Sequence, residues 1–284
     1  MNLRCRHLDL PLGSKTHLMG IINITEDSFS GDGILTTGEN LLEKVNRLRS
    51  DGMDIADIGG ETARTNRGPI SEQEEIDRVC PAIEQLAALF PDLPISINAW
   101  RPNVVEAALQ AGAHIVNDIG GLPDDTNACL ASRYAASLVI MHTRGEPKVP
   151  HTHVSYPDVI ADLLAWLEQK VSTAMTAGLV REQILLDPGL DFAKQRDDNL
   201  GVMRELSKLK RFSCPILLAP SRKTVIGDIL GLPPAERDAG TAALCVLGIH
   251  GGADVLRVHN VLAMRDVARM TDAILRSQSA ASTI

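Results

Sequence analysis

The sequence has few aromatic residues and no long apolar run, and each lack excludes a class of protein. Aromatic residues make up 3% of the 284 positions, too few for a platform that stacks on single-stranded nucleic acid. No stretch approaches the ~18 apolar residues of a membrane helix, and no signal-peptide pattern follows Met1. The formal net charge of −8 disfavours nucleic acid and anionic membranes as partners. We therefore expect a cytoplasmic protein that binds neither.

Several common chemical motifs are also missing. The five cysteines are widely spaced without a C-x-x-C pair, so we expect buried small side chains rather than a disulfide frame or a zinc site. No G-x-S-x-G, H-E-x-x-H or P-loop occurs, which excludes the hydrolase, zinc-protease and nucleotide-hydrolase classes that carry them. His151 and His153 stand two apart and would point to opposite faces of a strand, so we expect a solvated loop there.

Short apolar runs alternate with longer segments of helical period along the whole chain. This alternation predicts βα units around a buried parallel sheet. The expected strands cover residues 17–23, 53–59, 94–98, 113–118, 137–142, 183–187, 215–219 and 253–259. The expected helices cover residues 38–51, 72–90, 101–111, 125–135, 156–177, 196–210, 235–250 and 261–277.

Eight βα units without an internal linker predict a single (βα)8 TIM barrel, one domain over residues 1–284 with its barrel core at about 17–277. A doubly wound open sheet is the alternative. That fold would normally show G-x-G-x-x-G after its first strand, where residues 23–27 read N-I-T-E-D. In the helix at 72–90, Ser71 and Glu74 predict a capping box, and Pro81 predicts a kink or a later start.

Polar residues follow the expected strands at the edge where such barrels carry their chemistry. Asn98, Asn117 and Asp187 could converge on a flat heterocycle with several N–H groups. A cationic zone of Lys223, Arg257 and His259, with Asn23 beside it, fits a phosphate group. Each asparagine alone is also typical of a helix cap or a turn.

Seven segments in order resemble the motifs of the dihydropteroate synthase family, within the pterin-binding enzymes. They are M-G-I-I-N-I-T-E-D-S-F-S at 19–30, D-I-G-G-E-T-A-R at 57–64, N-D-I at 117–119, M-H at 141–142, L-D-P-G at 186–189, S-R-K at 221–223 and R-V-H at 257–259. The resemblance spans about residues 17–277. It implies a TIM barrel that condenses 6-hydroxymethyl-7,8-dihydropterin diphosphate with 4-aminobenzoate to dihydropteroate and diphosphate.

The resemblance also implies roles for individual residues. Asp187, Asn117, Asn98 and Lys223 would hold the pterin, and Asn23, Arg257, His259 and Arg64 would bind diphosphate, with Asn23 also a ligand of Mg²⁺. The aminobenzoate would contact Phe192, Ser221, Ala63 and Arg64, and the catalytic residues would be Asp187, Lys223, Asn23, Arg257 and His259. Arg222 is expected to form a structural salt bridge while Lys223 faces the site. The resemblance and the apolar last helix together predict a homodimer.

The chain departs from the family pattern at four places. The first loop reads T-E-D-S-F-S-G-D-G at residues 25–33, where T-P-D-S-F-S-D-G-G is usual in the family. In the second loop, residues 62–65 read T-A-R-T where S-T-R-P is usual, so Ala63 and Thr65 replace the family's threonine and proline. Asn98 replaces a carboxylate, and Asp191 adds one that would repel an acidic amine substrate. These changes leave two alternatives beside the synthase: a related enzyme with another amine substrate or a modified-pterin pathway, and a pterin-binding protein with little turnover.

Overall fold

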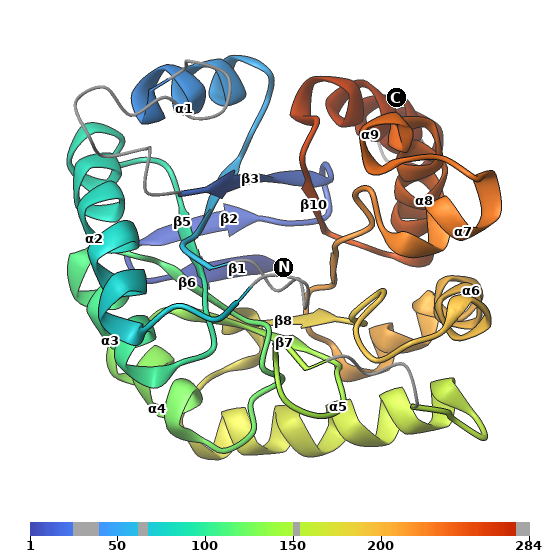
Figure 1. Cartoon of the computed structure of the whole chain (residues 1–284), viewed down its shortest axis with the longest axis horizontal. Helices are drawn as coiled ribbons and strands as arrows, with labels where there is room; N and C mark the ends of the chain where they lie inside the picture. The colour runs from blue at the N-terminus through green and yellow to red at the C-terminus, as the bar shows by residue number, and fades with distance from the viewer. Residues whose placement is uncertain (25–39, 62–67, 150–153, 277–284) are drawn as a thin grey trace, which may run out of the picture.

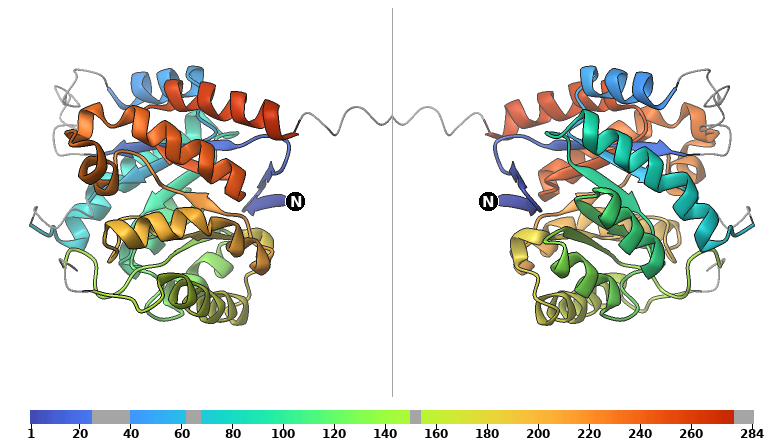
Figure 2. Two further views of the ribbon diagram at one scale, coloured as in Figure 1. Left: turned by 90° about the vertical axis from the view of Figure 1, so that its right-hand side faces the viewer. Right: turned by 90° about the vertical axis from the view of Figure 1, so that its left-hand side faces the viewer.

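Eight parallel strands form the barrel that the alternating sequence pattern predicts (Figure 1). The computed structural model describes residues 1–24, 40–61, 68–149 and 154–276. The strands follow the order β8-β7-β6-β5-β4-β3-β10-β9, and a parallel bridge between Leu186 and Ile216 joins the two ends of this order. The helices surround the strands, as Figure 2 shows from two sides. The structure therefore confirms the TIM barrel and not the open sheet.

The strand bounds agree closely with the apolar runs. The barrel strands are β3 (His17–Asn23), β4 (Ile55–Gly59), β5 (Ile95–Asn98), β6 (Ile115–Asp118), β7 (Ser137–Met141), β8 (Ile184–Asp187), β9 (Leu217–Leu218) and β10 (Val255–Val258). These strands are almost wholly buried, which explains their continuous apolarity.

The helices follow the segments of helical period. They are α1 (Leu41–Ser50), α2 (Glu72–Leu89), α3 (Pro102–Ala111), α4 (Thr126–Arg133), α5 (Val159–Thr176), α6 (Arg196–Arg204), α7 (Thr224–Leu230), α8 (Asp238–Gly251) and α9 (Val261–Arg276). In the described part of the chain, short 3₁₀ segments complete them: η2 (Arg181–Gln183), η3 (Leu206–Phe212) and η4 (Pro234–Glu236). The sequence pattern did not predict α7, a seven-residue helix after the S-R-K motif.

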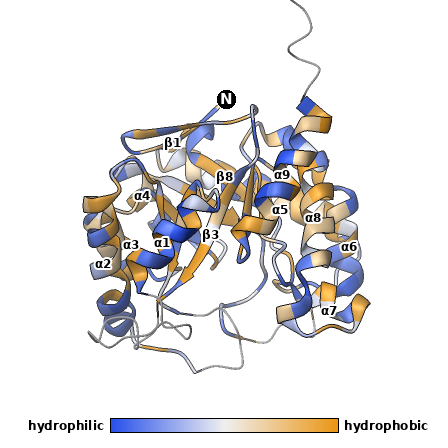
Figure 3. Cartoon of the chain, turned by 90° about the horizontal axis from the view of Figure 1, so that it is seen from above, coloured by the Kyte–Doolittle hydropathy of each residue, from blue (hydrophilic) through white to orange (hydrophobic). Residues whose placement is uncertain are grey.

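The N-terminal residues form an antiparallel hairpin that the sequence analysis missed. β1 (Asn2–Cys5) pairs with β2 (Leu8–Pro11) at the end of the barrel where the strands begin (Figure 3). Leu3 and Cys5 pack against interior residues such as Met19 and Val255. The hairpin thus closes the amino-terminal end of the barrel, which leaves the carboxyl-terminal end for a substrate site.

Two local predictions are only partly correct. Ser71 does cap α2, since its side chain accepts a hydrogen bond from the Glu74 N–H, but Glu74 pairs with Arg78. Pro81 lies inside α2 and does not delay its start at Glu72. Of the cysteines, Cys5, Cys214 and Cys245 are buried as expected, whereas Cys80 is half-buried and Cys129 is exposed. None of the described helices is long and apolar enough to cross a membrane.

Candidate active site

The site follows from the two-residue period of the barrel strands. Interior positions near the start of the strands are apolar and include Ile55, Ile115, Leu185 and Val255. Side chains two residues further on point to the same side of a strand. Those positions hold Asp57, Asn117, Asp187 and Arg257. These four side chains therefore form a polar layer next to the apolar interior residues, on the side of the carboxyl-terminal end of the barrel.

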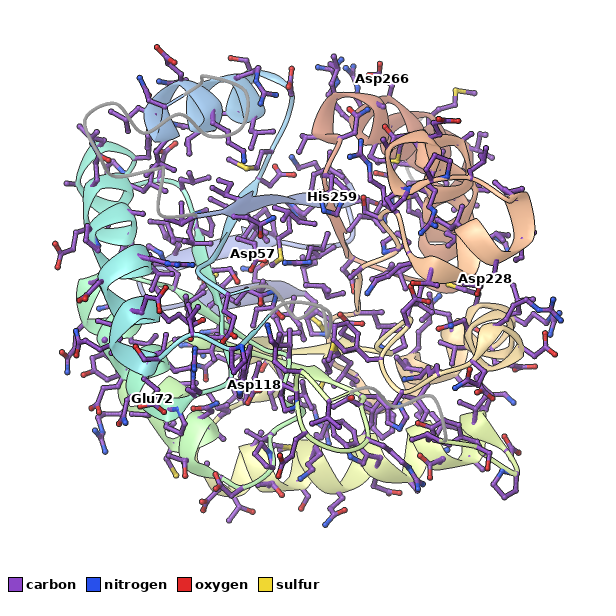
Figure 4. All side chains as sticks on the ribbon, viewed as in Figure 1. Asp57, Glu72, Asp118, Asp228, His259 and Asp266 are labelled. Carbon is purple, nitrogen blue, oxygen red and sulfur yellow. The ribbon has the colours of Figure 1, made fainter. Side chains whose placement is uncertain are left out.

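Asp57 is the centre of this layer, and the sequence analysis did not single it out as a site residue. Its side chain is fully buried and accepts from Arg257, with both Nε and Nη2 2.7 Å from Oδ2. The other oxygen, Oδ1, accepts from Ser96 Oγ at 2.7 Å and from Asn117 Nδ2 at 3.2 Å. Figure 4 shows Asp57 near the middle of the molecule, far from outer residues such as Asp266. This carboxylate joins four strands in one polar network.

Asp187 ends β8, and the turn after it fixes its carboxylate. Gly189 donates its N–H to Asp187 Oδ1 at 2.7 Å. Gly189 has a φ of +67°, and a Cβ there would lie 2.0 Å from the carbonyl oxygen of His142, so the turn requires glycine. Burial raises the pKa of Asp187, while the Gly189 N–H and nearby Lys223, Lys194 and Arg257 oppose that rise.

Lys194 lies beneath this turn and is a second residue that the sequence analysis missed. Its ammonium donates to three main-chain carbonyls, those of His142 at 3.1 Å, Gly189 at 3.0 Å and Phe192 at 3.1 Å. Burial lowers the pKa of Lys194 to about 7, and Asp187 counteracts part of that effect. Lys194 therefore holds the 187–194 segment in one shape and ties it to the end of β7.

Lys223 and Phe192 meet across the mouth of the barrel. The Lys223 ammonium lies 4.5 Å from the centroid of the Phe192 ring, within the range of a cation–π contact. Burial lowers the pKa of Lys223, and Asp191 and Asp187 oppose the change. The predicted pterin residue Lys223 and the predicted amine-binding residue Phe192 thus lie side by side.

Asp191, the carboxylate that departs from the family pattern, has close partners. It adopts a φ of +66°, and its side chain accepts from the N–H groups of Thr224 and Val225 at the start of α7. Asn199 also donates to its Oδ1 at 3.2 Å. Because these three donors offset its charge, Asp191 is a structural cap, which the sequence alone did not indicate. These contacts weaken the predicted repulsion between Asp191 and an acidic amine substrate.

Ser221 and His259 form a pair at the ends of β9 and β10. Ser221 Oγ lies 2.8 Å from His259 Nδ1 and accepts the His259 main-chain N–H at 3.2 Å. These two contacts link Ser221 to both the ring and the main chain of His259. Ser221 therefore orients His259, while its predicted contact with the amine substrate stays a prediction. Arg222 pairs with Asp238 at 2.9 Å, so its predicted structural role is confirmed.

Asn23, Gly59 and Asn98 lie together at the ends of β3, β4 and β5. A Cβ on Gly59 would lie 3.6 Å from Asn23 Oδ1 and 3.7 Å from Asn98 Cβ, so glycine leaves the space between the two amides open. Asn23 is exposed, and β3 pairs with β10, the strand that bears Arg257. Asn98 is opposite Asn117 in the β5–β6 register. The two predicted zones therefore meet at this edge.

Other polar strand ends point away from the barrel interior. Asp118 accepts from Asn127 Nδ2 at 2.9 Å and from the Gly120 N–H at 2.8 Å, and burial raises its pKa to about 6. His142 Nε2 lies 3.1 Å from Asp162 Oδ1, and burial lowers the pKa of His142 to about 2. Both residues hold helices against the sheet.

Part of the predicted site lies outside the described residues, namely Ala63, Arg64, Thr65, the first loop at 25–33, and His151 and His153. Within the described ranges, no group of three or more His, Cys, Asp or Glu side chains could hold a metal ion. Asn23 fits a magnesium ion only if phosphate oxygens and water supply the other ligands, which is common for Mg²⁺.

Comparison with known proteins places this site in a family context. The family model described as pterin binding enzyme matches residues 19–259. The dihydropteroate synthase of Synechocystis is 40% identical over 266 residues, covering 93% of this chain and 92% of the relative. That of Bacillus subtilis is 41% identical over 262 residues, covering 92% and 89%.

Solved structures agree. The dihydropteroate synthase of Yersinia pestis, in a sulfonamide drug complex, is 34% identical with a TM-score of 0.88, covering 98% of this chain and 100% of that one. The Thermus thermophilus enzyme in complex with 4-aminobenzoate is 33% identical with a TM-score of 0.85, covering 96% and 100%.

Proposed function

Because the chain belongs to the pterin-binding enzyme family, within it to the dihydropteroate synthases, we propose that it joins 6-hydroxymethyl-7,8-dihydropterin diphosphate to 4-aminobenzoate, forming dihydropteroate and diphosphate for folate biosynthesis. The observation that supports this best is the polar layer at the carboxyl-terminal end of the barrel. There Asp187 and Asn117 offer acceptors to a heterocycle, and Arg257 and Lys223 stand beside them as cations.

The pterin ring fits the acceptors of the barrel interior. The Asp187 carboxylate can accept two N–H groups from one edge of the ring, and Asn98 and Asn117 add amide groups from β5 and β6. Lys223 reaches the ring from the β9 side. Burial of Asp187 strengthens these contacts, because hydrogen bonds to a charged group are stronger away from water.

The reaction proceeds by loss of diphosphate before attack by the amine. Breaking the C–O bond leaves positive charge on the pterin, which the carboxylate of Asp187 would stabilise. Arg257 and His259 stabilise the departing diphosphate, as does Arg64. The aromatic amine captures the cation through its nitrogen lone pair. The resulting anilinium is acidic and loses its proton without a strong general base.

Magnesium, held by Asn23 and by phosphate oxygens, would neutralise part of the diphosphate charge. We expect the amine to contact Phe192 and Ser221, and the family resemblance also assigns Ala63 and Arg64 of the second loop to it. Phe192 supplies a flat surface for the benzene ring, and the adjacent Lys223 favours an acidic substituent electrostatically.

The subunit pairs with a second copy through α7, α8 and α9. One side of α9 packs inwards through Val261, Met264 and Ala268. Large apolar side chains remain exposed on the outer side of the three helices: Ile229, Leu230, Val246, Leu247, Leu262, Met270, Ile274 and Leu275. Figure 3 shows hydrophobic colours on the outside of this region. An apolar patch of this kind on a protein surface marks an interface. A monomeric mass by light scattering at micromolar concentration would contradict the homodimer.

The decisive experiment mixes the full chain with Mg²⁺, the dihydropterin diphosphate and 4-aminobenzoate, and follows diphosphate release and product mass. We expect dihydropteroate at roughly 1 per second or faster. Lys223→Met should abolish most of this activity, whereas Lys208→Met, at an exposed lysine paired with Glu205, should retain it. Diphosphate release without dihydropteroate would favour another amine substrate. Pterin binding without release would favour a binding protein with little turnover.

A further inference from the structure

We propose that Asp57 is a positioning residue that determines which atom of Asn117 faces the pterin and which edge of Arg257 remains for an anion. The inference rests on the proposed function, since it assigns Asn117 to the pterin and Arg257 to diphosphate. It starts from one buried carboxylate that accepts hydrogen bonds from three side chains on three other strands: Ser96 on β5, Asn117 on β6 and Arg257 on β10.

The orientation of the Asn117 amide follows from hydrogen-bond roles. A carboxylate only accepts hydrogen bonds, so the group that Asn117 turns towards Asp57 must be its NH₂. The distance from Nδ2 to Asp57 Oδ1 is 3.2 Å. The carbonyl oxygen of Asn117 then points the other way, and it accepts no hydrogen bond from the described residues. Asn117 is therefore set to accept an N–H from a ring and not to donate.

The same carboxylate contacts only one of the two hydrogen-bonding edges of the Arg257 guanidinium. Nε and Nη2 form the side edge of the group, and both lie 2.7 Å from Asp57 Oδ2. The end edge, which includes Nη1, takes no part in this contact. A guanidinium presents N–H donors along both edges in one plane, so fixing one edge fixes the direction of the other. Asp57 thereby aims the remaining donors of Arg257.

The negative charge of Asp57 also compensates the positive charge of Arg257 in the polar layer. Its side chain is fully buried, whereas that of Arg257 is 20% exposed, so the pair meets at the boundary between core and mouth. Loss of the carboxylate would leave Arg257 without its buried counter-charge. It would also remove the hydrogen-bond acceptor that fixes the orientation of the Asn117 amide. Both effects fall on substrate contacts, although Asp57 itself lies below them.

A double-mutant cycle on the full chain tests the assignment. We would measure the dissociation constant of 6-hydroxymethylpterin by calorimetry for wild type, Asp57→Asn, Asn117→Asp and the double variant. In Asp57→Asn, the side-chain oxygen of the new asparagine accepts from Arg257, so the NH₂ group of that asparagine faces Asn117. Two NH₂ groups cannot hydrogen-bond to each other, so we expect the Asn117 amide to rotate and present its oxygen to residue 57. In Asn117→Asp, two carboxylates face each other. The double variant restores a donor at 57 and an acceptor facing the ring.

We expect each single variant to weaken binding at least tenfold and the double variant to return to within about threefold of wild type. Asp254→Asn is the control, because it removes a half-buried carboxylate directly before β10, where Asp254 accepts from the Ile216 N–H at 3.0 Å. It should lower the melting temperature without changing pterin affinity.

Unchanged affinity in Asp57→Asn would overturn the proposal, as would a double variant no better than the weaker single one. A purely structural Asp57 would show itself as lower melting temperatures without this pattern of loss and rescue. Turnover of the wild type is measured separately, so failure of the proposed reaction is recognised independently of the binding cycle.

Discussion

Replacing Lys194 with methionine should make the stability of the protein lose a specific part of its pH dependence. Lys194 is 7% exposed, and burial lowers its pKa from 10.5 to about 7. That lowering corresponds to about 5 kcal/mol of free energy against burying the charge. Between pH 7 and pH 10.5 the unfolded chain keeps the proton that the folded chain has released. The folded state therefore gains stability as the pH rises through this window.

The size of the gain follows from the two pKa values. The slope approaches ~1.4 kcal/mol per pH unit once the folded protein has released the proton, so we expect about 2 kcal/mol between pH 7 and pH 9. Lys194→Met removes this titration and leaves the carbonyls of His142, Gly189 and Phe192 without their shared donor. The stability difference between wild type and variant should therefore be about 2 kcal/mol larger at pH 9 than at pH 7.

Urea denaturation at the two pH values measures this difference. The cysteines titrate alike in both proteins, so their contribution cancels. Lys208→Met is the control, because Lys208 is exposed and pairs with Glu205 on the surface. It should show no such change with pH. An equal difference between wild type and Lys194→Met at both pH values would refute the reasoning, since Lys194 would then keep its proton above pH 9.

Three further variants test other parts of the site. Asp191→Ala removes the cap on the Thr224 N–H and should lower stability by about 1 kcal/mol in urea denaturation; an undiminished midpoint would argue against the cap. Phe192→Ala should weaken apparent binding of the amine substrate in steady-state kinetics about tenfold with little change in pterin affinity, as for loss of one aromatic contact, and equal losses for both substrates would contradict its assignment to the amine. His142→Gln should reduce the acid sensitivity of the fold. The pKa of His142 is about 2 in the folded protein and 6.5 in the unfolded chain, so the unfolded chain takes up a proton as the pH falls and the wild type loses stability. Between pH 6 and pH 4 the free energy of unfolding should fall by about 2.5 kcal/mol more in the wild type than in the variant.

The barrel strands were predictable because the parallel strands of a barrel are buried on both sides. Each run, such as residues 137–142, had to be apolar throughout, which sets it apart from the helical segments. The sequence analysis missed the hairpin β1–β2 because its strands are only four residues long and its start is polar. Exposed side chains alternate with buried ones in β1 and with half-buried ones in β2. α7 escaped because seven residues are too few to show a helical period.

The site was only half predictable, for a reason of strand geometry. Polar residues at the ends of the expected strands include Asn98, Asn117 and Asp187, so these were predictable. Asp57 lies inside its strand, two residues before the end, and so was passed over. Counting two residues onward from the apolar interior position Ile55 would have found it, just as the same step reaches Asp187 from Leu185. Lys194 had no comparable signal, because its carbonyl partners depend on the shape of a turn.

Asn98 is an amide where the family resemblance leads us to expect a carboxylate, and this has a consequence for the charges that would face the pterin. Asp57 is tied to Arg257, so its charge is already compensated below the substrate. Among the described residues of the barrel interior, Asp187 is then the carboxylate that forms no ion pair. It accepts the Gly189 N–H and is held in place by the turn that Lys194 supports. Stabilisation of positive charge on the pterin therefore depends on Asp187. A change that displaces Asp187, such as loss of its contact with Gly189 or of the Lys194 ammonium, should reduce the reaction rate more here than in a barrel with a second unpaired carboxylate.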